Sequence, residues 1–117
     1  MRAAQLRKAA LALPGAEEKE TWGEATFRVR GKIFAMLSAD GRGASVKATL
    51  EQQAELVATA PGVFSVAAYV GRYGWVAIDV AAADAREVAE LLEDGWRRTA
   101  PKALVRARDA AKGDDPR

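Results

Sequence analysis

Residues 26–37 of the chain are TFRVRGKIFAML. Apolar and basic side chains alternate over the first five of these residues, which is the periodicity of a β-strand with one buried face. Gly31 then marks a tight connection, and residues 32–38 form the expected return strand. The segment therefore predicts an antiparallel hairpin.

The register of this hairpin determines which side chains enter the core. We expect a two-residue loop at Gly31 and Lys32. This register gathers large apolar side chains on one face, as a buried sheet requires. It places Phe27 opposite Met36 and Val29 opposite Phe34. The other face then carries Arg28, Arg30, Ile33 and Ala35.

A helix is expected before the hairpin, over residues 3–13, because leucine and alanine recur there at helical spacing. It ends at Pro14. Only five apolar residues separate Lys8 from Pro14, too few for the apolar region of a secretion signal, so we expect a cytoplasmic protein. An acidic loop over residues 16–20 is expected to lead into the hairpin.

After the hairpin, the residues DGRG at 40–43 are a turn signal, and a third strand is expected over residues 44–48. Thr49 and Gln52 have the spacing of a capping box and open a helix that ends before Pro61. The inward-facing side chains of this helix would be Leu50, Ala54 and Val57.

The second half of the chain continues with strand and helix signals. Residues 63–69 suit either a strand or a loop, whereas residues 75–80 alternate as a strand. Asp84 begins a long amphipathic helix that includes Trp96, and a last helix follows Pro101.

Short links between these elements favour an antiparallel β-sheet meander with helices packed mainly on one face, an α+β fold. A chain of 117 residues fits one domain, which we place at residues 1–112, before a frayed tail at residues 113–117. We expect a monomer.

The composition excludes several kinds of chemistry. Cysteine and histidine are both absent, so a disulfide framework, a thiolate nucleophile and a histidine-based metal site are ruled out. No apolar run approaches the length that spans a bilayer. We expect no enzyme activity, no catalytic residues, no metal site, no cofactor and no membrane association.

The net charge of +2 is unevenly distributed. Residues 25–48 hold five cations and one carboxylate, a local charge of +4. Residues 84–98 hold five carboxylates and three arginines, a local charge of −2. The hairpin region is therefore basic and the third helix acidic.

In this arrangement the sheet face opposite the core carries Arg28, Arg30, Lys47 and Trp75. Cations that meet phosphates, beside a ring that stacks on bases, predict a nucleic-acid-binding surface for DNA. The alternative is an ordinary solvated strand face on which an arginine stacks over a tryptophan.

Two other functions stay open. An aromatic ring flanked by arginines suits a protein-interaction module that docks a protein partner on the same face. A small-ligand-binding domain would instead use a pocket near Trp22, Tyr69 and Tyr73, and it needs a concave site with convergent polar groups.

Several short motifs occur together in a characteristic order: LPG at 13–15, TWG at 21–23, TFRV at 26–29, GKIFAML at 31–37, YVGR at 69–72, GWV at 74–76 and APK at 100–102. With these motifs, residues 6–106 resemble the MmcQ/YjbR-like proteins. The resemblance implies a compact α+β fold like that of CyaY (frataxin) and a double-wing DNA-binding motif. It implies no established catalytic residue or cofactor.

The positions that match this pattern and are expected to have surface roles are Trp22, Arg28, Lys32, Tyr69, Arg72, Trp75 and Lys102. Together with the basic strand face they give the expected nucleic-acid-binding set: Arg28, Arg30, Lys32, Lys47, Arg72, Trp75 and Lys102.

The chain departs from the family pattern in two places. Glu24 and Ala25 stand where members commonly carry His-Pro, so a role for that histidine cannot apply here. Residues 65–68 lack the proline that members tend to have, which leaves the conformation of that loop open.

Overall fold

The computed structural model describes residues 1–113, and over that range it contains four α-helices and one six-stranded antiparallel sheet. The helices are α1 (Ala3–Leu11), α2 (Leu50–Thr59), α3 (Ala85–Thr99) and α4 (Lys102–Gly113). The strands are β1 (Ala16–Thr21), β2 (Glu24–Val29), β3 (Lys32–Leu37), β4 (Gly43–Val46), β5 (Phe64–Val66) and β6 (Val76–Asp79).

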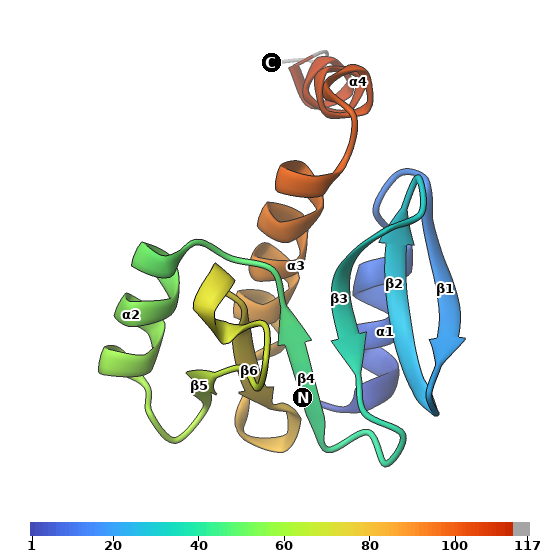
Figure 1. The fold of residues 1–117 in the computed structure, drawn as a ribbon. Coiled ribbons are helices and arrows are strands. Elements are labelled where there is room, and N and C mark those ends of the chain that lie inside the picture. The colour runs from blue at the N-terminus through green and yellow to red at the C-terminus, as the bar shows by residue number, and fades with distance from the viewer. Residues whose placement is uncertain (114–117) are drawn as a thin grey trace.

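The strands lie in the order β1-β2-β3-β4-β6-β5. Figure 1 shows α1 and α3 behind the sheet, α2 beside β5, and α4 at the end of the molecule where β2 turns into β3. The predicted α+β fold is confirmed. No helix within residues 1–113 is long and apolar enough to cross a membrane. The predicted tail lies, apart from Gly113, outside the described residues.

The expected acidic loop over residues 16–20 is instead part of the edge strand β1. It pairs antiparallel with β2 along all six of its residues. Trp22 and Gly23, with φ of 54° and 81°, form the two-residue turn between the strands. Charged side chains have low β-propensity but suit an edge strand, because they oppose pairing with a second sheet. The sequence signal was therefore misleading at this strand.

The turn between β2 and β3 lies one residue earlier than expected. Arg30 and Gly31 form it, with φ of 52° and 79°, and Val29 pairs directly with Lys32. A two-residue hairpin turn of this type needs positive φ at both central positions, and glycine accepts the second of them without strain. Arg30 therefore lies in the turn and not on the strand face where we expected it.

A β-bulge in β3 follows from this turn. Phe27 pairs with Ala35 and Arg28 pairs with Ile33, so Phe34 is an extra residue without a partner in β2. Phe34 and Ala35 are both fully buried as a result. The bulge brings two consecutive side chains of β3 into the core.

The bulge corrects two predicted side-chain positions. Met36, expected in the core, lies on the opposite face, and Ala35, expected on that face, is in the core. Phe27, Val29 and Phe34 are buried as predicted. We call the face turned away from α1 and α3 the outer face. Its side chains include Thr26, Arg28, Ile33, Met36, Ser45 and Ala77.

Helix α3 packs on the core face of the sheet. Asp84 caps it by accepting a backbone N–H at 3.0 Å, as predicted. Trp96 is fully buried, and its Nε1 donates to the carbonyl oxygen of Pro14 at 2.8 Å, which ties α3 to the loop between α1 and β1. A Cβ atom at Gly95 would lie 2.9 Å from the carbonyl oxygen of Lys47. This glycine therefore allows the close approach of α3 to the sheet.

Residues 67–74, which we call the 67–74 segment, are held against α2. Gln53 is buried, and its side-chain amide donates to the carbonyl oxygens of Gly71 and Trp75 at 2.8 and 2.6 Å. Gly74 has a φ of 102°, and a Cβ atom there would lie 2.6 Å from a backbone oxygen just before α2. Buried hydrogen bonds and close backbone packing thus fix the segment.

The inward face of α2 differs from the expected one. Thr49 caps the helix by accepting the backbone N–H of Gln52 at 3.1 Å, as predicted. Val57 is half-buried, but Leu50 and Ala54 are exposed. The buried position belongs to the polar Gln53, which the apolar periodicity could not indicate.

We expect Gly74→Ala to destabilise the protein by about 3 kcal/mol, because it combines a strained backbone with an overlap between the added Cβ atom and the backbone just before α2. Gly62→Ala is the matched control, since a Cβ atom at Gly62 meets nothing within 4 Å and its φ is not positive. The control should change the free energy of unfolding by about 0.5 kcal/mol or less. Urea unfolding followed by circular dichroism measures both. Equal effects of the two substitutions would contradict the packing described here.

Candidate functional site

Trp75 is not exposed on the surface of the sheet. Its side chain is only 8% exposed, so the ring expected to stack on bases is buried. Strand β6 begins at Val76, directly after this residue. Its carbonyl oxygen instead accepts hydrogen bonds from Gln53 and from the backbone N–H of Ala67. Trp75 is part of the junction between α2 and the 67–74 segment.

Arg28 does lie on the outer face, as predicted, but it is half-buried. Its guanidinium donates to the hydroxyl oxygens of Thr26 and Thr21, both at 3.1 Å, and to the carbonyl oxygen of Gly31 at 3.4 Å. These bonds hold the side chain along the hairpin. Lys47 follows β4 and is also half-buried.

The other predicted cations are exposed but lie in two places. Arg30 and Lys32 are at the β2–β3 turn, and Lys102 is the first residue of α4. Figure 1 shows the turn and α4 at the same end of the molecule. Arg72 lies apart from them in the 67–74 segment, where its guanidinium is 4.8 Å from the ring centre of Tyr73.

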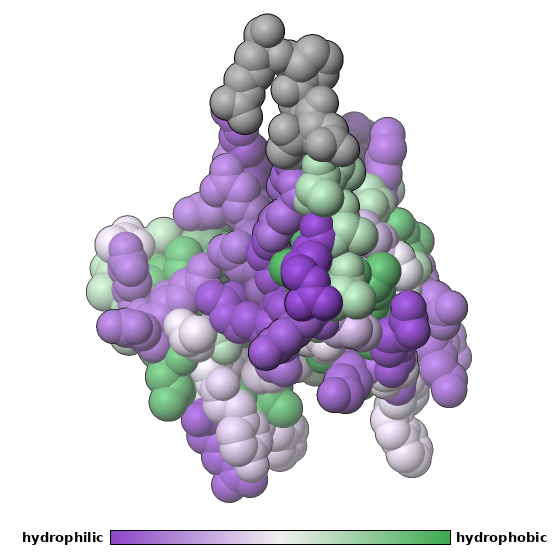
Figure 2. Space-filling model, turned by 90° about the horizontal axis from the view of Figure 1, so that it is seen from above, coloured by the Kyte–Doolittle hydropathy of each residue, from purple (hydrophilic) through white to green (hydrophobic). Residues whose placement is uncertain are grey.

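Contacts confirm that the β2–β3 turn and α4 are neighbours. A Cβ atom at Gly15 would lie 3.5 Å from the side chain of Leu104 on α4 and 3.7 Å from that of Val29, which precedes the turn. Two further exposed cations lie near the start of α4 in the chain, Arg98 in the last turn of α3 and Arg106 on α4 itself. We call the set the basic end: Arg30, Lys32, Arg98, Lys102 and Arg106. Figure 2 views this end of the molecule, and its surface is largely hydrophilic.

Sequence reasoning missed Arg98 and Arg106. Residues 97–112 hold six cations and one carboxylate, a local charge of +5, which exceeds that of the hairpin region. This count was the available signal. The five carboxylates of residues 84–98 hide this excess of cations when the charge is counted over that helix, which overlaps the start of the stretch.

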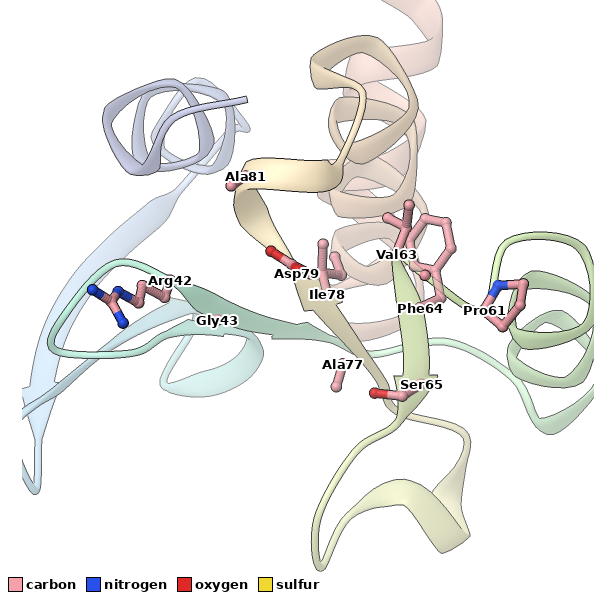
Figure 3. A pocket seen from close by; sticks show the side chains of 11 residues that line it. Arg42, Gly43, Pro61, Val63, Phe64, Ser65, Ala77, Ile78, Asp79 and Ala81 are labelled. Carbon is pink, nitrogen blue, oxygen red and sulfur yellow. The ribbon is translucent and has the colours of Figure 1, made fainter.

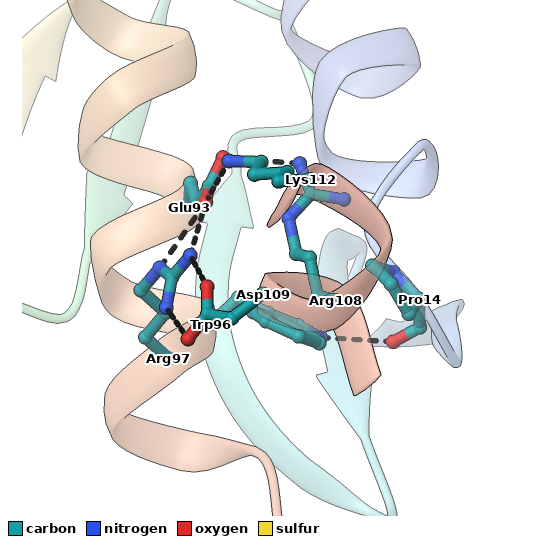
Figure 4. A network of polar contacts seen from close by, with 7 residues as sticks. All are labelled: Pro14, Glu93, Trp96, Arg97, Arg108, Asp109 and Lys112. Atoms are coloured by element: carbon teal, nitrogen blue, oxygen red, sulfur yellow. Dashed lines mark hydrogen bonds and ion pairs between the residues drawn. The ribbon is translucent and has the colours of Figure 1, made fainter. Parts of the chain in front are cut away.

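A network of ion pairs holds α4 on α3 (Figure 4). Glu93 accepts hydrogen bonds from Arg97 and Arg108, each at 3.0 Å, and from Lys112 at 2.9 Å. Arg97 also pairs with Asp109 at 2.6 Å. The hydrogen bond from Arg108, supported by those from Lys112 and Arg97, lowers the pKa of Glu93 to about 2. The network fixes the helix that carries Lys102 and Arg106.

The outer face is hollowed between the β1–β2 hairpin and the 67–74 segment. Two adjoining open hollows, of about 280 and 220 Å³, share four lining residues. These are Glu24, Met36, Ser45 and Ala77. The first hollow is completed by residues 67–70, and we call the pair the outer hollow. Figure 2 shows two projections with a recess between them on this side of the molecule.

Two aromatic side chains are almost completely exposed near the outer hollow. Trp22, at the tip of the β1–β2 hairpin, is 97% exposed, and Tyr69, in the 67–74 segment, is 96% exposed. Both have positive φ, 54° and 63°. We expected three aromatic residues around a pocket. Tyr69 lines the outer hollow, whereas Trp22 and Tyr73 line neither the outer hollow nor the hollow at the end of α2.

A larger open hollow of about 570 Å³ lies where β4, β6 and β5 meet the end of α2 (Figure 3). Its two charged lining residues are Arg42 and Asp79. Figure 3 shows the guanidinium of Arg42 pointing away from Pro61 on the opposite wall. The hollow therefore lacks the convergent polar groups of a small-molecule site.

The fold and these surfaces define a small α+β protein with a basic end and an aromatic-flanked hollow on its sheet. A family model described as YjbR matches residues 11–98, and the chain belongs to the YjbR family, as its motifs predicted. Its structure is similar to the crystal structure of Deinococcus radiodurans protein DR2400, which has a DUF419 domain. The TM-score is 0.73 at 20% identity, over 81% of this chain and 75% of that chain, which is a likeness of fold. No curated protein matches the chain.

We expect Glu93 to make the stability depend on acid pH. Its pKa is lowered in the folded protein, so its contribution is complete above the pKa of about 4.3 that it has when unfolded and is lost as the pH falls toward 2. Glu93→Gln should lower the free energy of unfolding by about 1 kcal/mol at pH 6 and by much less at pH 2.5. Urea unfolding at both pH values measures the difference.

Glu90→Gln, on the same helix, is the control, because Glu90 forms no ion pair within residues 1–113. This variant should keep the pH dependence of the natural chain. A Glu93→Gln protein with that same pH dependence would show that the network does not hold α4 in solution.

Proposed function

We propose that the protein is a non-enzymatic DNA-binding protein that contacts the phosphate backbone through its basic end. The observation that carries the proposal is the exposure of Arg30, Lys32, Arg98, Lys102 and Arg106 at one end of the molecule. Within residues 1–113 none of these five side chains forms an ion pair. Cations that are not neutralised by carboxylates are available to displace the counterions of DNA.

The outer face supports DNA binding less well than the basic end does. Its cations Lys19, Arg28 and Lys47 share the face with as many carboxylates, Glu17, Glu24 and Asp79, so that these side chains add no net charge, although no ion pair joins them within residues 1–113. Arg28 is also committed to hydrogen bonds within the hairpin. We therefore place the interface at the basic end and not on the sheet face. Arg72 lies away from this end.

The basic end consists of arginine and lysine side chains on the β2–β3 turn, at the end of α3 and on the first turns of α4. Arginine and lysine side chains on a turn and on the first helical turns of α4 suit phosphate contacts, which set affinity and orientation without reading sequence. The ion pairs of Glu93 support this use, because they hold α4 against α3 and thereby fix the spacing of its exposed cations. We propose binding with little sequence preference.

Fluorescence anisotropy with a labelled duplex tests the proposal. If all five cations contact phosphates, log K should fall against log of the salt concentration with a slope of about −4.5. Removing three of the charges by Arg30→Gln, Lys32→Gln and Lys102→Gln should make the slope shallower by about 3. The same titration with single-stranded DNA and with RNA identifies the preferred nucleic acid.

The matched control is Arg2→Gln, Lys19→Gln and Arg86→Gln, which removes the same total charge from exposed positions before α1, within β1 and at the start of α3. This control should bind nearly as the natural chain does. A duplex affinity reduced equally by the two triple variants would show that net charge, and not the basic end, governs binding. No binding at low salt would contradict the proposal altogether.

A second function, the docking of a protein partner, is favoured by a different observation. Trp22 and Tyr69 are almost fully exposed on the two elements that flank the outer hollow. Large aromatic rings anchor many protein interfaces. The outer hollow is thus a candidate docking surface that is separate from the basic end.

A further inference from the structure

We infer that the outer hollow binds an arginine-bearing, extended segment of a partner protein, with Glu24 pairing with the guanidinium and Tyr69 stacking on it. This inference rests on the protein-docking function proposed above and is independent of DNA binding. The exposed rings indicate a protein partner, and the carboxylate of Glu24 indicates that the partner is cationic.

The charge of the hollow selects a cationic occupant. Glu24 is the one charged residue that lines either part of the outer hollow. It is exposed and forms no ion pair within residues 1–113. The hairpin that carries it, residues 16–29, holds four glutamates against one lysine and one arginine, a local charge of −2.

The neighbouring arginine does not neutralise Glu24. Arg28 lies on the same face of β2, but its guanidinium is engaged by the hydroxyl groups of Thr21 and Thr26 and by the carbonyl of Gly31. These hydrogen bonds bring the guanidinium to Thr21, which pairs with Glu24 across the hairpin, but use its donors on oxygens other than the Glu24 carboxylate. The carboxylate of Glu24 is therefore left for a cation from outside.

Tyr69 supplies a ring on the opposite wall of the hollow. Its backbone has a φ of 63°, and the following residues are fixed by the packing of Gly74 and by the hydrogen bonds of Gln53. Within residues 1–113 no cation stacks on it, whereas the ring of Tyr73 is already covered by Arg72. A planar guanidinium suits this pairing, because it accepts a ring face and a carboxylate at the same time.

The floor of the hollow suits an extended backbone. Met36, Ser45 and Ala77 are uncharged, and the last two are small, so a chain can approach the sheet closely. The two parts of the hollow adjoin through shared residues and are open to solvent. This shape is longer than a single side chain requires, which favours a peptide segment over a free amino acid.

The test is an NMR titration of the isotope-labelled protein with an octapeptide of glycine and serine that carries two arginines. Its twin carries citrulline, an uncharged analogue of arginine, at the same positions. We expect the arginine peptide to shift the amide signals of Glu24, Ser45, Tyr69 and Ala77. The citrulline peptide should bind at least about tenfold more weakly.

Two substitutions locate the interaction. Glu24→Gln and Tyr69→Ala should each weaken the binding of the arginine peptide by about fivefold to tenfold. Both side chains are exposed, so both variants should keep the fold. Glu55→Gln on α2 and Tyr73→Ala are the matched controls and should leave the affinity unchanged. An affinity that is the same for both peptides, or that survives both site substitutions, would overturn the inference.

The remaining outcomes separate this site from the DNA-binding one. Glu24→Gln should leave duplex binding unchanged, and the triple variant of the basic end should leave peptide binding unchanged. If light scattering shows self-association that Glu24→Gln abolishes, the occupant is a second copy of the chain and the partner-protein inference is wrong. Competition by single-stranded DNA for the hollow, with no peptide binding, would also overturn it.

Discussion

The extra residue in β3 is the constraint on which the two-faced sheet depends. Phe34 has no partner in β2, and the bulge lets it enter the core together with Ala35. A regular strand would have turned one of them outward. Because of the bulge, Met36 faces outward beside Ser45 and Ala77, and this uncharged floor becomes the outer hollow. The core side is closed by α3 through the buried Trp96.

The same architecture places the cations of the basic end and the exposed aromatic rings on different parts of the molecule. Strands β2 and β3 carry their turn, with Arg30, to the end where α4 lies, while the β1–β2 turn carries Trp22 to the opposite end of the hairpin. The ion pairs of Glu93 then hold α4 in place, so that its cations join those of the β2–β3 turn. A molecule of small net charge thus presents two surfaces of different chemistry, one suited to phosphates and one to a cationic protein segment.

Local sequence signals predicted those parts of the structure that depend on interactions between residues close in sequence. Alternation placed Phe27 and Val29 in the core, and side-chain caps located the start of α3 at Asp84. The wrong predictions concern features that depend on contacts between different segments of the chain, which a local pattern does not indicate. Strand β1 is made by pairing with β2 despite its charged residues, and Trp75 is buried at the junction with α2, where Gln53 donates to its carbonyl oxygen. The basic end joins residues far apart in sequence, so only Arg30, Lys32 and Lys102 of its members were predicted.

The separation of the two surfaces is tested most directly by mapping amide chemical shifts of the isotope-labelled protein during titration with a short DNA duplex. We expect the largest changes at the β2–β3 turn, around Arg30 and Lys32, and over the first turns of α4. The amide signals of Glu24, Ser45 and Ala77 in the outer hollow should stay unchanged. Changes concentrated in the outer hollow, with the basic end unaffected, would contradict this account.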